Sequence, residues 1–417
     1  MERDSRVLIK PNFVTDRYYH ERLVDKSLLA SSTHASVIRP LVDFALERGA
    51  AEILVADTPI EGCDLQSVTR GLGFDAMVSA LQARGKPIRF LDLRPFRLVP
   101  KMLIDDIRML GRSWNFGALM RQDLAGDPEG YEVVDLAETS RFDEVEHRAE
   151  RLRFHRANPT IPVGHHSGGK HEYGIPRSVL NADLIIHVPK LKTHKKSGIT
   201  MALKSSIGLC GYKYWLPHYT EGVPEEGDEF PSQPRMAERI AMKLSRLPMP
   251  RGHSAVLRAP PVNTRPPITE GSWEGNDTIW RTTLDLARIH THAARDGVVG
   301  SEQARGTFTV IDGIVAGEGE GPFGVTPVPI GLLIAGEDPV LVDAVGSKAM
   351  GFDWRRIPTI ARAFERPFLS TSRIDGLDTR WEGPPADRIF QAPRAWPSLN
   401  GGPDNQARSF PDEEWAG

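Results

Sequence analysis

The chain has 417 residues, of which 40% are hydrophobic and 26% charged, as in ordinary globular proteins, so widespread disorder is excluded. Its 52 lysines and arginines face 55 aspartates and glutamates, which gives a formal net charge of −3. A nucleic-acid-binding protein normally carries a basic excess, so we expect no nucleic-acid partner. Any anion site must therefore be a local cluster of basic residues.

Cysteine content and the length of the apolar runs limit the compartment and the class of protein. The two cysteines, Cys63 and Cys210, are too few for a disulfide framework or an all-cysteine cluster within one chain, so no iron–sulfur cluster is expected. The N-terminus has no apolar core of signal-peptide length, and no stretch reaches the roughly 18 apolar residues of a membrane span. We predict a cytoplasmic protein with no membrane partner.

Short apolar runs separated by segments of helical periodicity indicate an α/β protein. Continuous apolar runs of this length suit strands that are buried on both faces of a parallel sheet. The expected strands cover residues 6–9, 53–56, 184–188, 308–311 and 328–335. The expected helices cover residues 37–48, 236–247, 278–294 and 340–350, with caps at Asn276-Asp277 and Asp338-Pro339 for the last two.

These elements predict mostly parallel sheets with flanking helices, arranged as two α/β lobes with the site between them. The first lobe is expected to span residues 1–175 and the second residues 176–370, with an insertion rich in proline and charge at 222–275. Residues 371–417 form a tail rich in proline, glycine and charge, which we expect to wrap the surface or to be partly mobile.

A charged residue follows four of the predicted strands. These residues are Lys10, Asp57, Lys190 and Asp312. In open parallel sheets ligands bind outside the carboxyl ends of the strands, so four charges at such ends predict one shared site. The plainer interpretation is that each charge simply begins a polar loop.

The densest group of basic residues lies between positions 189 and 208. It contains Lys190, Lys192 and His194, followed by a predicted helix that opens at Ser197 or Gly198 and runs to residue 207. The free N–H groups at such a helix start would favour an anion, although a short lysine run is more often a solvated turn. Within the helix, Thr200 and Lys204 share one face, and a lysine among small apolar residues tends to become a base or nucleophile.

Histidines and carboxylates offer further candidates. His165, His166 and His171 lie in a glycine-rich stretch that could place imidazoles on a metal or substrate, or form a flexible loop. His218, with Asp228 and Glu229 downstream, could supply an acid/base or metal-binding group. The glycine-rich stretch 313–324 is expected to form a turn after a strand, with Glu318 as a polar contact or the whole stretch as a lid.

The order of these motifs resembles the family called domain of unknown function 362, over most of residues 6–355. The likeness rests on residues 7–12, 189–194, 216–218, 276–281, 311–315 and 337–340. Some members of that family are similar to iron–sulfur proteins through ferredoxin-type cysteine motifs, which this sequence lacks. The family has no generally established reaction.

A second resemblance is to the lactate racemases that use a nickel-pincer nucleotide. In that family a histidine precedes a lysine that is joined covalently to the cofactor, and another histidine follows; His194, Lys204 and His218 match this order. His34, after Thr33, and Arg39 are similar to an early basic anion-binding motif. Ala202-Leu203 stands where that family has a glycine pair before the lysine.

The sequence thus predicts an enzyme that acts on a small carboxylate or phosphate by proton transfer at carbon, as in racemisation, epimerisation or elimination. His194, Lys204 and His218 would do the chemistry. The anion would be held by Lys10, Asn12, His34, Arg39, Lys190, Lys192, Thr200, Asp312 and Glu318.

Two other functions stay open at this point. A magnesium-dependent transferase or hydrolase would use the carboxylates Asp228, Glu229, Asp312 and Glu318, of which the first two are the candidate metal ligands. A binding protein for a small anionic metabolite would use the same basic residues without catalysis. The cofactor is unknown, with a nickel-pincer nucleotide or a divalent metal as the two candidates, and a homo-oligomer is compatible with the sequence.

Overall fold

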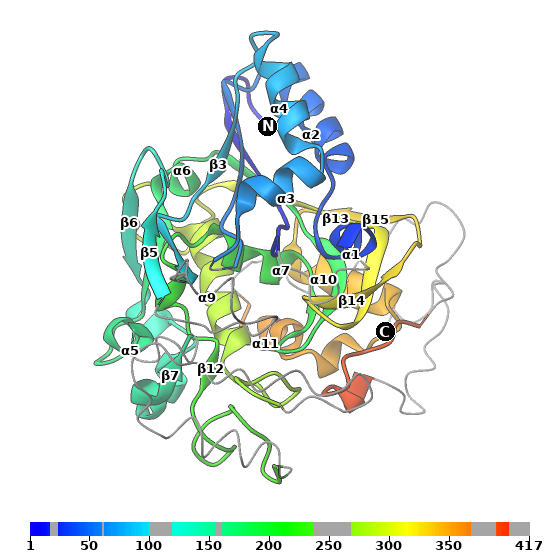
Figure 1. Ribbon diagram of the computed structural model, residues 1–417. Coiled ribbons are helices and arrows are strands. Elements are labelled where there is room, and N and C mark those ends of the chain that lie inside the picture. Colours follow the sequence, from blue (N-terminus) through cyan, green and yellow to red (C-terminus); the bar gives the residue numbers. More distant parts are fainter. Residues whose placement is uncertain are drawn as a thin grey trace, which may run out of the picture.

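The computed structural model shows a mixed α/β protein built on one large, mostly parallel sheet with helices on both faces, as predicted (Figure 1). The structure describes residues 1–16, 24–60, 62–100, 119–154, 161–234, 236, 268–367 and 389–399. Among these residues, none of the helices is both long enough and apolar enough to span a bilayer.

The central sheet has the strand order β11-β10-β13-β9-β1-β2-β3, with β14 and β15 also paired to β13. Strand β1 runs parallel to both β2 and β9, and β13 runs parallel to both β9 and β10. The strands are β1 (Arg6–Pro11), β2 (Glu52–Asp57), β3 (Ile88–Asp92), β9 (Leu184–Val188), β10 (Lys190–His194), β11 (Gly198–Thr200), β13 (Gly306–Glu320), β14 (Gly324–Val328) and β15 (Leu332–Gly336).

Three two-stranded sheets lie outside this central sheet. They pair β4 (Phe96–Pro100) with β5 (Leu119–Asp123), β6 (Tyr131–Asp135) with β8 (Glu172–Pro176), and β7 (Leu152–Arg153) with β12 (Tyr219–Thr220). Strands from both sides of residue 176 share the central sheet, so the chain crosses from one predicted lobe to the other within one sheet. The two-lobe division itself remains a prediction.

Two strand predictions need correction. The glycine-rich stretch 313–324 is not simply a turn, because β13 continues through it to Glu320 and pairs with β10 and β14. At Gly317 a side chain would lie 2.8 Å from the carbonyl oxygen of Ala30, so the glycine allows the chain segments to approach closely. The predicted strand 328–335 is two strands, separated by a turn at Gly331 with φ of +66°.

Three predicted helices are confirmed. These are α2 (Ala35–Glu47), α9 (Ile279–His292) and α10 (Pro339–Ala349). Asp338 accepts hydrogen bonds from the N–H groups of Val340 and Leu341, so it caps α10 as expected. Asn276 caps α9 in the same way by accepting from Thr278 and Ile279. The predicted helix 236–247 lies outside the described residues apart from position 236.

The predicted helix from residue 197 or 198 to residue 207 is wrong in its first part. Gly198 has φ of +76° and pairs with His194, so residues 198–200 form strand β11 of a hairpin with β10. A helix begins only at Ala202, as α7 (Ala202–Ser205), and continues as the 3-10 helix η5 (Ser206–Leu209). The hairpin keeps the backbone extended where side-chain periodicity alone favoured a helix.

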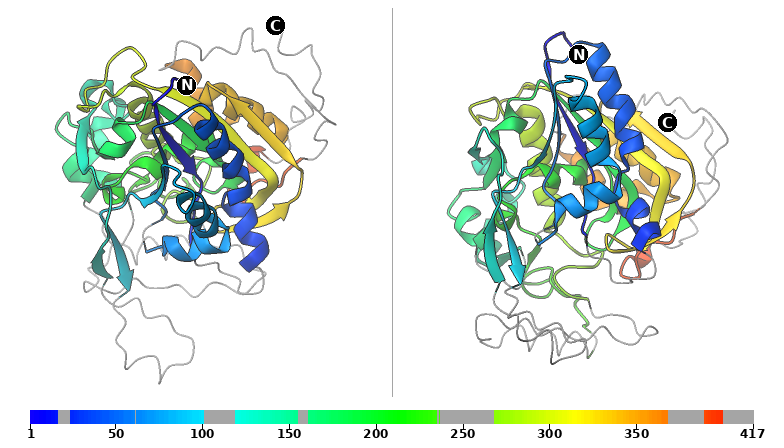
Figure 2. Two further views of the ribbon diagram at one scale, coloured as in Figure 1. Left: turned by 90° about the horizontal axis from the view of Figure 1, so that it is seen from above. Right: turned by 45° about the horizontal axis from the view of Figure 1, so that its top comes forward.

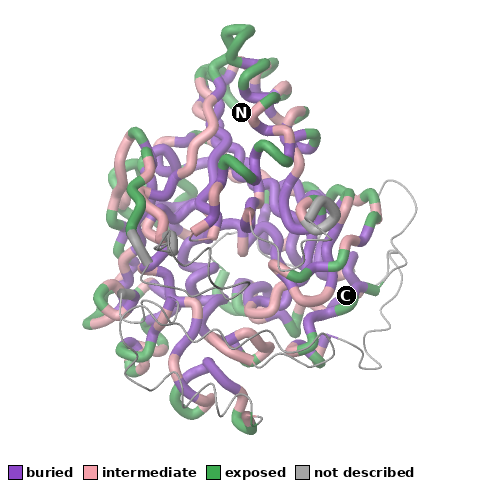
Figure 3. The backbone as a smooth tube through the Cα atoms, viewed as in Figure 1, coloured by how far each residue is buried: buried purple, intermediate pink, exposed green. Residues whose placement is uncertain are grey.

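Figure 2 shows helices on either side of the central sheet, and Figure 3 shows buried residues along its strands. On strand β1, Val7 and Ile9 point into one apolar cluster, and Leu8 points into another on the opposite face. The remaining α-helices are α1 (Val24–Ser31), α3 (Leu65–Gly71), α4 (Phe74–Gln82), α5 (Ile161–His165), α6 (Arg177–Leu180) and α11 (Pro358–Glu365).

The described part of the tail, residues 389–399, is packed into a third apolar cluster. Phe390 and Trp396 are each 1% exposed there, beside residues of β13, α10 and α11. The indole nitrogen of Trp396 donates to the carbonyl of Lys195 at 2.6 Å. This part of the tail is therefore a structural element that covers the turn after β10.

Candidate functional site

The four charged residues that the sequence predicted at strand ends form two buried ion pairs. Lys10 Nζ lies 2.9 Å from Asp57 Oδ1, and Lys190 Nζ lies 2.8 Å from Asp312 Oδ2. All four side chains are at most 2% exposed. The pairing follows from the sheet order, because β1 adjoins β2 and Lys190 stands opposite Asp312 in the register of β10 and β13. Each ion pair thus joins two neighbouring strands of the central sheet.

Lys192 lies fully buried close to both pairs. Its ammonium donates to Asn12 Oδ1 at 2.7 Å and to the carbonyl of Ser31, and it has no carboxylate partner among the described residues. Burial lowers the pKa of Lys192 well below its ordinary value, and the positive charges of Lys190, Lys204 and Lys10 lower it further. Among the described residues, Lys192 therefore has no counter-charge in contact.

Lys204 is carried by the short helix α7 and is partly exposed to solvent. Burial and the charges of Lys213, Lys196 and Lys10 lower the pKa of Lys204 to about 7. A substantial fraction of the amine is therefore unprotonated near neutral pH and can accept a proton or attack a carbonyl carbon. This agrees with the prediction that a lysine among small apolar residues loses proton affinity.

The segment after Lys204 touches the strand ends directly. A side chain at Gly208 would come within 2.6 Å of Asp57 Oδ1 and would also collide with Lys10, so only glycine fits against this ion pair. The N–H of Thr58 donates to the carbonyl of Gly208 at 2.9 Å. The polypeptide from 204 to 208 thus brings Lys204 to the same end of the sheet as Lys10.

His194 and His218 are partly exposed, and their hydrogen bonds define complementary tautomers. His194 Nδ1 accepts from the N–H of Lys196 at 3.0 Å, so in the neutral ring the proton is on Nε2. His218 Nδ1 is 3.0 Å from the carbonyl of Leu216 and must donate to it, so its Nε2 carries a lone pair. For both rings the pKa is lowered well below the ordinary value, first by burial and then by nearby lysines including Lys204. One neutral imidazole offers a proton and the other can accept one.

One face of the β10–β11 hairpin carries several of these groups together. Side chains alternate along a strand, so Lys190, Lys192 and His194 share a face of β10. Thr200 stands directly opposite Lys192 in the antiparallel register and shares that face. The hydroxyl of Thr200 is buried and has no hydrogen-bond partner in the part of the chain that is described. It is available to a ligand.

We call this group the cationic cluster. Lys213 joins it through its electrostatic effect on Lys204, and sequence reasoning missed this residue. Lys213 donates to the carbonyl of Ile207 at 2.7 Å, and burial is the main cause that lowers its pKa to about 8. No local sequence signal distinguishes it from a surface lysine. The cluster comprises Lys10, Asn12, Asp57, Lys190, Lys192, His194, Thr200, Lys204, Lys213, His218 and Asp312.

Two predicted anion-binding residues are engaged on helix α2 instead. His34 caps this helix by accepting from the N–H of Ser36. Arg39 pairs with Asp43 one turn further along at 2.8 Å, with both side chains about 40% exposed. The basic spacing that suggested an anion motif is accounted for by capping and by an i, i+4 ion pair.

The carboxylates proposed for a metal or substrate are held by hydrogen bonds to the protein. Asp228 is buried and accepts from the N–H groups of Thr220 and Asp277 and from the hydroxyl of Thr278. Burial is the main cause that raises the pKa of Asp228 to about 6. Glu229 is also buried, and Glu318 accepts from the N–H of Gln391, which fixes the tail to the sheet.

The described residues contain no group of three or more histidine, cysteine or acidic side chains positioned to hold a metal ion. In the histidine-rich segment, His165 pairs with Glu172 at 2.9 Å and stacks on Trp215. His166 and His171 are fully buried among aromatic rings. These contacts point to a packing role for the segment.

The fold and the cationic cluster define a mixed α/β protein with a basic site at the ends of a mostly parallel sheet. The chain belongs to the family described as domain of unknown function (DUF362), whose model matches residues 7–114 and 124–348. No curated protein matches the chain, so the likeness to nickel-pincer lactate racemases stays a prediction. A crystal structure of a Thermotoga maritima protein, a structural genomics target, is similar at 11% identity with a TM-score of 0.35. The match covers 84% of this chain but only 53% of that one.

Proposed function

We propose that the protein is an enzyme that binds a small carboxylate or phosphate in the cationic cluster and moves a proton at a carbon of that substrate. Racemisation, epimerisation and elimination all fit this description. The observation that carries the proposal is Lys192, a fully buried amine whose hydrogen-bond partners are the neutral oxygens of Asn12 and Ser31.

The balance of charge supports anion binding. Two buried carboxylates, Asp57 and Asp312, are each engaged by one lysine, which leaves the other lysines of the cluster without a buried counter-charge in contact. Burial without a counter-charge disfavours the protonated form of these lysines, and a bound anion would stabilise that form. The orphan hydroxyl of Thr200, on the face of Lys192, would add a hydrogen bond to the same anion.

The proton-transfer part of the proposal rests on three groups that surround this position. Lys204, with a pKa of about 7, is suited to accept a proton near neutral pH, and a general base works best when its pKa lies near the working pH. His218 Nε2 offers a second lone pair, and His194 Nε2 offers a proton. An acid and a base that are both neutral can exchange a proton at a carbon without first changing the charge of the site.

Two alternative functions compete with this one. Magnesium chemistry would need free carboxylates, whereas Asp312 is paired with Lys190 and Asp228 is surrounded by protein donors. A non-catalytic anion-binding protein would use the same cluster and would catalyse no exchange.

If the chain carries a nickel-pincer nucleotide, Lys204 is the residue that would hold it, and intact-mass measurement of the natively produced protein would reveal the added mass.

The test measures the exchange of a carbon-bound proton of the substrate for deuterium. The protein is incubated in D2O with a panel of 2-hydroxy, 2-amino and phosphorylated carboxylic acids, and deuterium incorporation is followed by mass spectrometry. We expect one structural class to exchange, with Lys192→Met abolishing it and Lys195→Met, on the half-exposed side chain beside Glu320, leaving it unchanged. Anion binding with no exchange on any compound would leave the binding-protein alternative. Equal anion affinity in wild type and Lys192→Met would overturn the site itself.

A further inference from the structure

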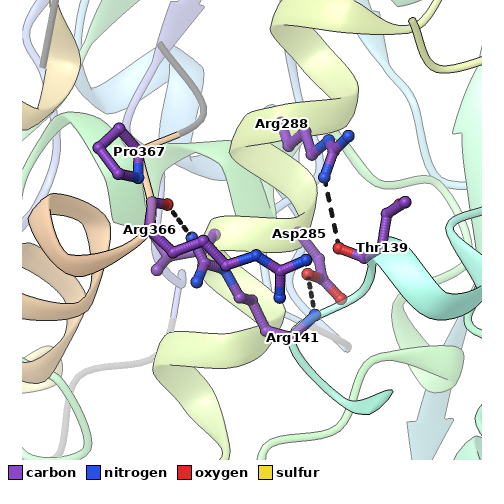
Figure 4. Close-up of a pocket in the computed structure, with 7 residues that line it drawn as sticks. Thr139, Arg141, Asp285, Arg288, Arg366 and Pro367 are labelled. Carbon is purple, nitrogen blue, oxygen red and sulfur yellow. Dashed lines mark hydrogen bonds between the residues drawn. The ribbon is translucent and has the colours of Figure 1, made fainter. Parts of the chain in front are cut away.

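A second group of basic residues lies apart from the cationic cluster, around a small cavity of about 30 Å³ on helix α9 (Figure 4). Arg141 follows the 3-10 helix η3 (Ala137–Thr139), Arg288 comes from α9, and Arg366 immediately follows α11. Figure 4 shows their side chains converging on the space beside Asp285. The cavity is lined by Thr139, Arg141, Leu284, Asp285, Arg288, Arg366 and Pro367.

The guanidinium groups of this cavity have few direct contacts with carboxylates. Within the described residues, neither Arg141 nor Arg288 forms an ion pair with a carboxylate; each donates instead to a backbone carbonyl, of Arg366 and Thr139 respectively. Arg366 lies 3.6 Å from Glu144, which is shared with Arg281 at 2.8 Å. Each guanidinium has five N–H donors, so most of the donors remain for a ligand.

Asp285 lines the cavity, and its charge raises the pKa of Arg141 and of Arg288, but its hydrogen bonds go to other groups. Its carboxylate accepts from the hydroxyls of Ser140 and Tyr173 and from the backbone N–H of Arg141. The hydrogen-bond donors that hold the Asp285 carboxylate are therefore all neutral. Desolvation by burial, followed by the charge of Arg366, lowers the pKa of Arg141, and desolvation also lowers the pKa of Arg288. The arginines thus repel one another and are partly removed from water.

We propose that this cavity is a binding site for a small oxyanion, with phosphate or sulfate as the chemical class. Planar guanidinium groups match the geometry of oxyanions and hold them by paired hydrogen bonds. The cavity, with a volume of about 30 Å³, is small, so only a compact anion enters it. The site is independent of the proposed catalytic function, because none of its residues belongs to the cationic cluster.

Helix α9 stands between the two sites. Its Thr282 hydroxyl donates to the carbonyl of Pro217, next to His218, while Asp285 and Arg288 line the arginine cavity. An anion in the arginine cavity would remove repulsion between Arg288 of α9 and the arginines that follow η3 and α11. Its expected effect is therefore to hold these three elements together and to raise the thermal stability of the protein.

The test uses inorganic phosphate and arginine-specific labelling with phenylglyoxal, read by peptide mass spectrometry on the full chain. We expect millimolar phosphate or sulfate to slow labelling of Arg288 and Arg366 at least threefold. Arg39, which is paired with Asp43 on α2, should be labelled at an unchanged rate. Sodium chloride at equal ionic strength controls for screening, and acetate tests whether a carboxylate suffices. Equal rates at Arg288 with and without phosphate would overturn the proposal.

A pair of variants separates this site from the cationic cluster. Arg288→Gln should raise the phosphate concentration that half-protects Arg366 by tenfold or more, whereas Lys192→Met should leave that concentration as in wild type. Circular dichroism confirms that each variant is folded. The opposite result would contradict a second site: if Lys192→Met lost the arginine protection and Arg288→Gln kept it, phosphate would bind in the cationic cluster alone.

Discussion

Asp343 Oδ1 accepts a hydrogen bond from the N–H of Ala202 at 2.7 Å, and its other oxygen accepts from Leu203 at 3.0 Å. A carboxylate of helix α10 thereby caps α7, which has no capping side chain of its own. The cap fixes the start of the short helix that carries Lys204. A residue far away in sequence thus positions the amine at the centre of the proposed site.

The first prediction concerns this cap. In Asp343→Asn the amide can accept from only one of the two N–H groups and turns a donor towards the other. We expect a loss of about 1–3 kcal/mol in the free energy of unfolding, measured by urea denaturation. Proton exchange at the substrate carbon should fall as well, because Lys204 loses its fixed position. Asp353→Asn, which changes the cap of a 3-10 helix outside the site, is the matched control and should leave exchange unchanged.

Much of the sheet could be predicted because an apolar run of four or five residues between polar segments is typical of a buried strand. Asp57 does end β2, and Lys10 lies one residue before the end of β1. Lys190 comes after β9 but itself begins β10, and Asp312 lies inside β13, so the prediction that Asp312 follows a strand was wrong. Lys10 and Lys190 do pair with Asp57 and Asp312. The pairing of each lysine with a particular aspartate could not be predicted, because it depends on strand order, which apolar periodicity does not define.

The hairpin and the caps could not be predicted for a related reason. Residues 197–207 have helical periodicity, but the pairing of β11 with β10 and the positive φ of Gly198 impose an extended start. The role of Asp343 depends on α10 folding against α7, and the role of Lys213 depends on burial. The hairpin, the cap by Asp343 and the burial of Lys213 all depend on interactions between distant segments, which no local pattern of residues predicts.

A second prediction concerns Gly208. In Gly208→Ala the new methyl group would collide with Lys10 and would lie 2.6 Å from Asp57 Oδ1, so the buried ion pair must move. We expect a loss of about 1–3 kcal/mol in unfolding free energy from overpacking, more if the pair separates. Gly164→Ala is the control, because nothing lies within 4 Å of its added Cβ. Equal melting temperatures for the two variants would contradict the close approach of residue 208 to the ion pair.

A third prediction concerns stability as a function of pH. The pKa of Lys204 is about 7 and that of Lys213 about 8 in the folded protein, and both rise to the ordinary value of 10.5 on unfolding. Between pH 7 and 8.5 the unfolded chain binds more protons, so folding stability should rise with pH. Lys204→Met removes one of these groups and should reduce that rise by about 1–2 kcal/mol over the interval. Parallel stability curves for wild type and variant from chemical denaturation would show that the Lys204 amine keeps its ordinary pKa.

The last prediction separates the charge of Lys204 from its basicity. Arginine stays protonated at every working pH, so Lys204→Arg retains a cation for the anion but cannot accept a proton. We expect anion affinity within about threefold of wild type, because the guanidinium supplies a cation in place of the amine, while proton exchange at the substrate carbon falls by about 10²–10⁴, the usual contribution of a general base. Isothermal titration measures the first quantity and deuterium incorporation the second. Lys204→Met should lose both binding strength and exchange, so a Lys204→Arg variant that exchanges at the wild-type rate would assign the base to His218, whose Nε2 carries the other lone pair.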